Sequence, residues 1–185
     1  DSGKLEKSLP LEGTIMPEPT GSDNAMILTA SYTDKGINGV KPLTGVQSVA
    51  LQGSTVPFSE STKAKGFSPV AFGGMNLLLL PEDEGWFALE NIDLKGVNSA
   101  MVTAGWQEAP KAGIEVELHL NSPDGELLGK GNMPTPQAGQ PGGAILIPLN
   151  KEMDVKADEL YFVYKPKEGE APGQMAVTGV KFAGR

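Results

Sequence analysis

A strict two-residue alternation is the feature of this sequence that most constrains its fold. Between Gly113 and Asn121, every second residue is a branched apolar one, and the residues between them are Glu, His or Asn. Successive side chains of a β-strand point to opposite faces of the sheet, so the pattern predicts a strand with one buried and one solvated face. The turn residues Ser122–Gly125 follow directly, and they predict that Glu126–Lys130 folds back as an antiparallel partner.

Similar short apolar segments recur along the rest of the chain, separated by turn signals such as Gly73-Gly74 and Pro141–Gly143. This rhythm, together with 24 Gly and 15 Pro, predicts an all-β sandwich or jelly roll and disfavours long helices. The eight segments are Met26–Ser31, Val46–Leu51, Met75–Leu80, Trp86–Asn91, Ser99–Ala104, Ala144–Leu149, Leu160–Lys165 and Met175–Phe182.

The first 48 residues differ in texture from the rest, because Pro10, Pro17 and Pro19 interrupt them. Two or three short strands cannot bury a core alone. We therefore expect residues 1–48 to be a β-rich N-terminal connector that packs on a main sandwich domain formed by residues 49–185.

Composition excludes several function classes. The formal net charge of −8 argues against a nucleic-acid partner, since phosphate binding needs clustered Lys and Arg. The absence of Cys rules out disulfides, thiolate metal sites and a Cys nucleophile within this sequence. No apolar run reaches the length that a membrane span needs. Residues 1–10 are polar, so we expect any targeting segment to have been removed upstream of Asp1.

Three passages, in order, resemble family-6-like carbohydrate-binding modules. Gly85–Val97 reads GWFALENIDLKGV and resembles that family's G-D-W-x-x-Y-x-N-I-D-L-x-G-V passage. Gly113–Gly125 resembles its G-T-I-E-V-R-L-D-S-P-D-G, and Asp158–Lys165 resembles its H-D-L-Y-F-V-F-K. The resemblance covers residues 49–182 and implies a galactose-binding-like jelly-roll sandwich.

A second resemblance lies at the front of the chain. Leu9–Thr14 and Ala30–Gly45 are similar to the segment that precedes such modules in secreted bacterial proteins with a sugar-dehydrogenase-like propeller and a cytochrome c domain. It implies an accessory piece at the C-terminal end of a larger exported protein. The expected location is periplasmic, cell-surface or extracellular, and neighbouring domains of that protein are expected partners.

The family's sugar-stacking aromatics are missing at the matched positions. Its loop aromatic falls in the aromatic-free segment 76–80, and its G-G-W aromatic is matched by Ala144. The acids of its structural calcium site are matched by Gln52 and Thr178, so no cofactor is expected and the calcium ligands are lost. The acidic turn Glu82, Asp83 and Glu84 is a weak alternative cation site, although a solvated turn is the simpler interpretation.

The remaining aromatic side chains supply the candidate contacts. Trp86 matches a family position inside the sandwich, so we expect it in the core. Trp106 ends a strand beside Gln107 and Glu108, whose polar groups could hydrogen-bond a sugar next to its ring. The alternative is that Trp106 covers the sandwich end. Tyr32 is the second aromatic candidate, although its loop could pack structurally.

No motif supports catalysis. The Glu115, Glu117 and His119 row could in principle form a weak metal or acid–base site, but a solvated strand face explains it more simply. No nucleophile elbow, phosphate loop or metal motif is present. The sequence thus predicts a non-catalytic accessory module that binds polysaccharide or oligosaccharide through a non-standard site. The alternative is a structural or protein-docking domain that has lost sugar binding.

Overall fold

The computed structural model describes residues 25–37, 39, 41–110, 113–137, 139–151, 153–154, 156–166 and 174–184. Within these ranges all regular structure is β, in thirteen strands and no helix, which confirms the all-β prediction. None of the described segments is therefore a helix that could cross a membrane. The chain divides into two compact units, Asp1–Gly53 and Ser54–Arg185.

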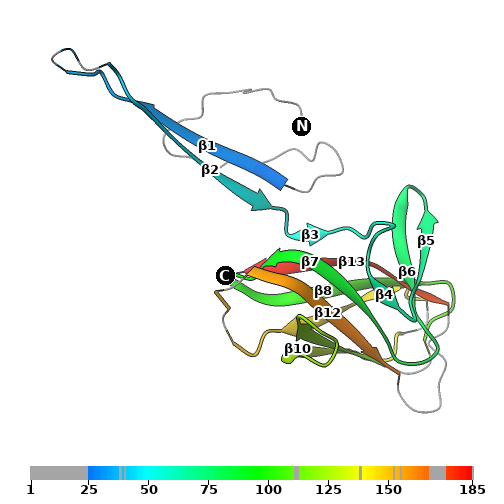
Figure 1. Ribbon diagram of the computed structural model, residues 1–185. Helices are drawn as coiled ribbons and strands as arrows, with labels where there is room; N and C mark the ends of the chain where they lie inside the picture. The colour runs from blue at the N-terminus through cyan, green and yellow to red at the C-terminus, as the bar shows by residue number, and fades with distance from the viewer. Residues whose placement is uncertain are drawn as a thin grey trace. The chain divides into compact units, whose positions relative to one another are not determined.

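The described part of the first unit is a two-stranded antiparallel hairpin. β1 (Ala25–Thr33) pairs with β2 (Thr44–Gln52) through nine successive residue pairs without a register shift (Figure 1). β2 spans residues 48 and 49, where the sequence suggested the domain boundary. The expected packing of this segment on the sandwich stays a prediction, as do the front matches at Leu9–Thr14, which lie outside the described residues.

The second unit contains two antiparallel sheets (Figure 1). The five-stranded sheet contains, in order, β10 (Glu126–Met133), β9 (Ile114–Leu120), β12 (Lys156–Lys165), β7 (Gly85–Asp93) and β4 (Ala64–Lys65). The six-stranded sheet contains β11 (Gly142–Pro148), β8 (Val97–Trp106), β13 (Met175–Gly184), β6 (Met75–Leu79) and β5 (Ser68–Phe72), with β3 (Thr55–Val56) paired to β13.

The clearest predicted hairpin is confirmed. β9 and β10 pair from Leu120 with Glu126 to Ile114 with Met133, with one bulge after Leu127. The tight turn requires glycine at position 125, because a Cβ there would lie 2.0 Å from the carbonyl oxygen of Leu120. All eight other predicted segments also coincide with strands, whereas the short strands β3, β4 and β5 were not predicted.

The core lies between the two sheets and centres on aromatic rings. Phe87 on β7 is stacked on Phe162 of β12, with ring centroids 4.9 Å apart and planes 5° from parallel. The rings of Phe58 and Phe67 meet the Phe87 ring edge-on, with centroid distances of 5.2 and 5.4 Å. Burial of these rings and the alternating apolar residues of β9, β8 and β11 supplies the main stabilisation of the sandwich.

Candidate functional site

The outer face of the five-stranded sheet carries a second, smaller aromatic cluster. Trp86 lies directly opposite Val163 and Ala88 directly opposite Tyr161, because β7 and β12 pair antiparallel in that register. The rings of Trp86 and Tyr161 meet edge-to-face, with centroids 5.0 Å apart and planes at 66°. Ala88, Tyr161 and Val163 are buried, and the half-buried indole of Trp86 packs against them.

Trp86 is therefore not a core residue, and the prediction that placed it there is wrong. Side chains alternate along β7, and Phe87 and Leu89 take the inward positions. Trp86 consequently belongs to the opposite, solvent-facing surface. Alternation along the strand requires Trp86 and Phe87 to face opposite sides of the sheet, and the structure shows that Phe87 is the one that faces the core.

A charged network borders one side of this aromatic cluster. The ammonium group of Lys63 contacts Glu90 at 2.6 Å and also pairs with Glu159, while the Tyr161 hydroxyl donates to Glu159 Oε2 at 2.5 Å. The bond from Lys63 lowers the pKa of the Glu159 carboxyl and raises that of Lys63 itself. The hydrogen bond from the Tyr161 hydroxyl also lowers the pKa of Glu159, and it raises the pKa of the Tyr161 phenol.

A second polar group borders the other side of the cluster. Glu117 Oε2 lies 2.6 Å from Lys165 Nζ and 3.2 Å from His119 Nε2. The Lys165 bond lowers the pKa of Glu117. His119 Nδ1 lies 3.0 Å from the carbonyl oxygen of Gly125, so both ring nitrogens face oxygen acceptors, and a neutral imidazole can donate to one of them only.

The carboxylates that border the cluster are all engaged by protein partners. Glu90 and Glu159 pair with Lys63, and Glu117 pairs with Lys165, so each carboxylate already has a cationic partner within the protein. Among the described residues no three His, Asp or Glu side chains are placed to hold a metal ion. Neither the Glu115, Glu117, His119 row nor the acidic turn forms such a cluster. Glu82, Asp83 and Glu84 are exposed in the turn between β6 and β7.

The structure places Trp106 at the end of β8, at one end of the sandwich. Its Nε1 donates to the carbonyl oxygen of Gln140 at 2.5 Å, and its ring is partly buried against the core. The ring also lies against Gly143, where a Cβ would come within 3.1 Å of Cη2. Exposed Gln107 and Glu108 follow it, so the three candidates are contiguous at this edge, and their role in ligand binding stays a prediction.

Tyr32 lies in β1, in the other compact unit, with 74% of its surface exposed. Its role in ligand contact is also untested. The residues that the sequence analysis missed are Trp86 and Tyr161, together with the lysine and glutamate side chains that surround them.

The outer face of the six-stranded sheet has a different chemistry. Its strands present Leu146, Phe72 and Met75 with 58–69% of their surfaces exposed. On the central strands β8 and β13, the hydroxyl groups of Thr103 and Thr178 are hydrogen-bonded at 2.9 Å. Lys181 is the charged residue among the described positions of this face. This face of the sheet therefore offers few charged partners for a sugar.

A comparison with solved structures places the sandwich in a known architecture. No protein-family model and no curated protein match the chain. A family 6 carbohydrate-binding module from Clostridium cellulolyticum, solved with xylose, superposes with a TM-score of 0.56 at 17% identity, covering 71% of this chain and 97% of that one. A β-1,3-glucan-binding module of the same family from Bacillus halodurans gives 0.55 at 19% identity, covering 70% and 95%.

A third module, from Clostridium stercorarium in complex with cellobiose, gives a TM-score of 0.53 at 16% identity, covering 72% of this chain and 95% of that one. The chain has a jelly-roll β-sandwich fold. At these identities the likeness establishes the architecture, and it confirms the predicted fold class. The jelly roll leaves the outer face of its five-stranded sheet and the Trp106 end as two separate candidate surfaces.

Proposed function

We propose that this chain is a non-catalytic accessory module that binds a polysaccharide or oligosaccharide on the outer face of the five-stranded sheet. The observation that carries the proposal is the half-buried indole of Trp86, which packs against buried Tyr161 on the outer face of the sheet between two groups of charged side chains. Solved proteins with the same fold are carbohydrate-binding modules, and their descriptions name xylose, cellobiose and β-1,3-glucan.

The chemistry of the surface suits a polyhydroxylated ring. The apolar face of a pyranose packs on an aromatic side chain, and its hydroxyl groups exchange hydrogen bonds with nearby carboxylates and ammonium groups. Trp86 offers the ring, while Glu90, Lys63 and Lys165 lie at the margins with half or nearly half of their side chains exposed. Buried Ala88 and Val163, the cross-strand neighbours of the two aromatic residues, pack beside the two rings on the same face.

Trp106, Gln107 and Glu108 provide a second, smaller candidate contact at the end of the sandwich. The indole N–H there is already bonded to Gln140, so a sugar would meet only the exposed part of the ring. The membership of this module in an exported bacterial protein rests on the sequence resemblance of the front segment to secreted multidomain proteins.

Affinity electrophoresis against plant, algal and host polysaccharides tests the proposal. At least one polymer should retard the wild-type chain, and Trp86→Ala should abolish the retardation while Trp86→Phe retains part of it. Trp106→Ala is the matched control at the other tryptophan. Equal melting temperatures for Trp86→Phe and the wild type would show that lost binding reflects the ring. The proposal fails if no polymer retards the wild type, or if only Trp106→Ala reduces retardation.

One observation favours the alternative of a structural or protein-docking domain. The exposed apolar residues Phe72 and Met75 are paired across the β5–β6 hairpin on the outer face of the six-stranded sheet, and exposed apolar surface on soluble proteins often marks contacts with other proteins. A wild-type chain that ignores every polysaccharide would support this alternative.

A further inference from the structure

The β1–β2 hairpin has a surface that the proposed function does not use. β1 and β2 are nine residues each, and neither contains a charged residue, in a chain with a net charge of −8. Within the described part of the chain, each strand has the other as its one hydrogen-bonded neighbour. The outer edge of β1 therefore presents a row of backbone N–H and C=O groups with no Pro or Gly in the strand.

The side chains of the hairpin are as exposed as its backbone edge. Leu28 and Tyr32 share one face with Val49, and Ile27 and Val46 share the other. Their exposed fractions range from 39% for Leu28 to 74% for Tyr32. A two-stranded hairpin is marginally stable in water by itself, whereas three or more strands with an apolar face are stable. Additional strands would therefore stabilise the hairpin.

We propose that β1 pairs with β1 of a second copy of this chain, giving a four-stranded sheet with the order β2-β1-β1-β2. Natural edge strands avoid such pairing through charges, Pro residues or bulges, and β1 has none of the three in its regular register. A second copy suits this edge because two uncharged strands can approach without the like-charge repulsion that the acidic chain would otherwise impose.

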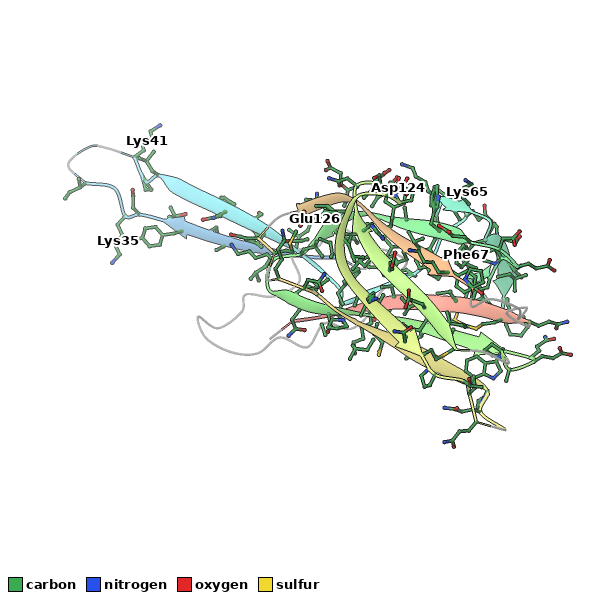
Figure 2. The ribbon with its side chains drawn as sticks, turned by 90° about the horizontal axis from the view of Figure 1, so that it is seen from below. Lys35, Lys41, Lys65, Phe67, Asp124 and Glu126 are labelled. Carbon is green, nitrogen blue, oxygen red and sulfur yellow. The ribbon has the colours of Figure 1, made fainter. Side chains whose placement is uncertain are left out.

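The charges of the connecting turn fix the orientation. Lys35 and Lys41 lie at the end of the hairpin where β1 leads into β2, as Figure 2 shows. The Asp34 carboxylate beside them accepts hydrogen bonds from the backbone N–H groups of Gly36 and Leu43. A parallel arrangement would bring the lysines of the two turns together. An antiparallel arrangement about a two-fold axis places them at opposite ends, about 30 Å apart for nine-residue strands.

A two-fold axis through the middle of β1 places Thr29 opposite Thr29 of the second copy. Antiparallel partners have Cα atoms about 4.5–5.5 Å apart, which is within the range that a disulfide spans. The natural chain has no Cys, so a single introduced thiol reports on this contact alone. Ser48 is the matched control, because its hydroxyl bonds Thr29 at 2.9 Å and either substitution removes that same bond.

The test uses the full 185-residue chain. Sedimentation equilibrium should give a dimer, and mild oxidation should cross-link Thr29→Cys but not Ser48→Cys, whose copies would be about three strand spacings apart. Thr29→Lys should raise the dimer dissociation constant about tenfold or more by placing like charges opposite each other, and Ser48→Lys should change it little. Unchanged tryptophan fluorescence would show that the sandwich is intact, since both Trp residues lie in it.

Three outcomes would overturn the inference. A wild-type chain that remains monomeric at every concentration excludes the pairing. Cross-linking of Ser48→Cys as efficient as that of Thr29→Cys excludes the β1 edge as the contact. Open-ended growth into larger species excludes a closed two-fold dimer. None of these outcomes bears on polysaccharide binding, which the retardation assay measures separately.

Discussion

Tyr161 and Glu159, two residues apart on β12, are joined by a hydrogen bond in which the phenolic hydroxyl donates to Oε2 at 2.5 Å. The same carboxylate accepts from Lys63, so one glutamate connects the aromatic cluster to the charged margin of the sheet. The bond fixes the phenol, against which the indole of Trp86 packs. The aromatic cluster and its charged border are thus one connected unit.

The stability of the sandwich should depend on pH through its paired carboxylates. The pKa values of Glu159 and Glu117 are both lowered in the folded chain from the ordinary 4.5, mainly by their bonds to Lys63 and Lys165. A lowered folded-state pKa stabilises the fold above the unfolded value, and this contribution disappears as the pH falls through the folded value. Glu117→Gln should therefore lower the melting temperature at neutral pH.

The difference between Glu117→Gln and the wild type should shrink as the pH falls below 4.5. Melting temperatures measured between neutral and strongly acidic pH check the prediction, with Glu108→Gln in the exposed loop as the control. A difference that grows toward acid would have the wrong sign and would exclude this assignment.

The stacked rings of Phe87 and Phe162 should dominate the stability of the core. Phe87→Ala removes a side chain that is 1% exposed and contacts three other phenylalanine rings, so the free energy of unfolding should fall by about 3–5 kcal/mol. Urea denaturation measures the change. Phe72→Ala, at a ring that is 69% exposed, should change it by less than about 0.5 kcal/mol. Comparable losses for the two variants would contradict the described core.

Gly143 should be sensitive to a single added methyl group. A Cβ at this position would lie 2.7 Å from Met133 Sδ and 3.1 Å from Trp106 Cη2, so Gly143→Ala should cost about 1–3 kcal/mol and shift the tryptophan emission. Gly105→Ala is the control in the paired strand, because its nearest contact would be an ordinary 3.7 Å. Equal stability of the two variants would show that the ring does not lie over Gly143.

Removal of divalent cations should leave the sandwich intact. The resemblance to family-6-like modules matches the acids of their calcium site to Gln52 and Thr178, and the described residues contain no group of three acidic or histidine ligands placed for a metal. A chelator should therefore change the melting temperature by no more than the experimental error in differential scanning fluorimetry. A large drop that added calcium reverses would reveal a structural metal.

Alternation of side chains predicted β9, because one face of that strand is apolar and the other is polar, and the turn residues Ser122–Gly125 predicted that β10 pairs with it. The strand β7 was predicted as well, but the family resemblance placed Trp86 in the core, and alternation could not correct this because Trp86, Phe87, Ala88 and Leu89 form a continuous apolar run. The contact between Trp86 and Tyr161 joins residues 75 positions apart in sequence, and only strand pairing brings them together. Local patterns therefore predicted the architecture, while the candidate platform required the register of two distant strands.

Gly85 has a consequence for how this sequence can change over evolution. A Cβ there would lie 2.7 Å from both the Lys65 carbonyl oxygen and Pro81 Cγ, so the backbone that leads into β7 is closely packed and has no room for a side chain. A single-residue insertion or deletion in the preceding turn would have to be absorbed by sliding β7, and a slide of one residue exchanges the two faces of a strand. Trp86 would then point inward and Phe87 outward. Lineages that keep the surface ring should tolerate substitutions in residues 81–84 more readily than changes in their number.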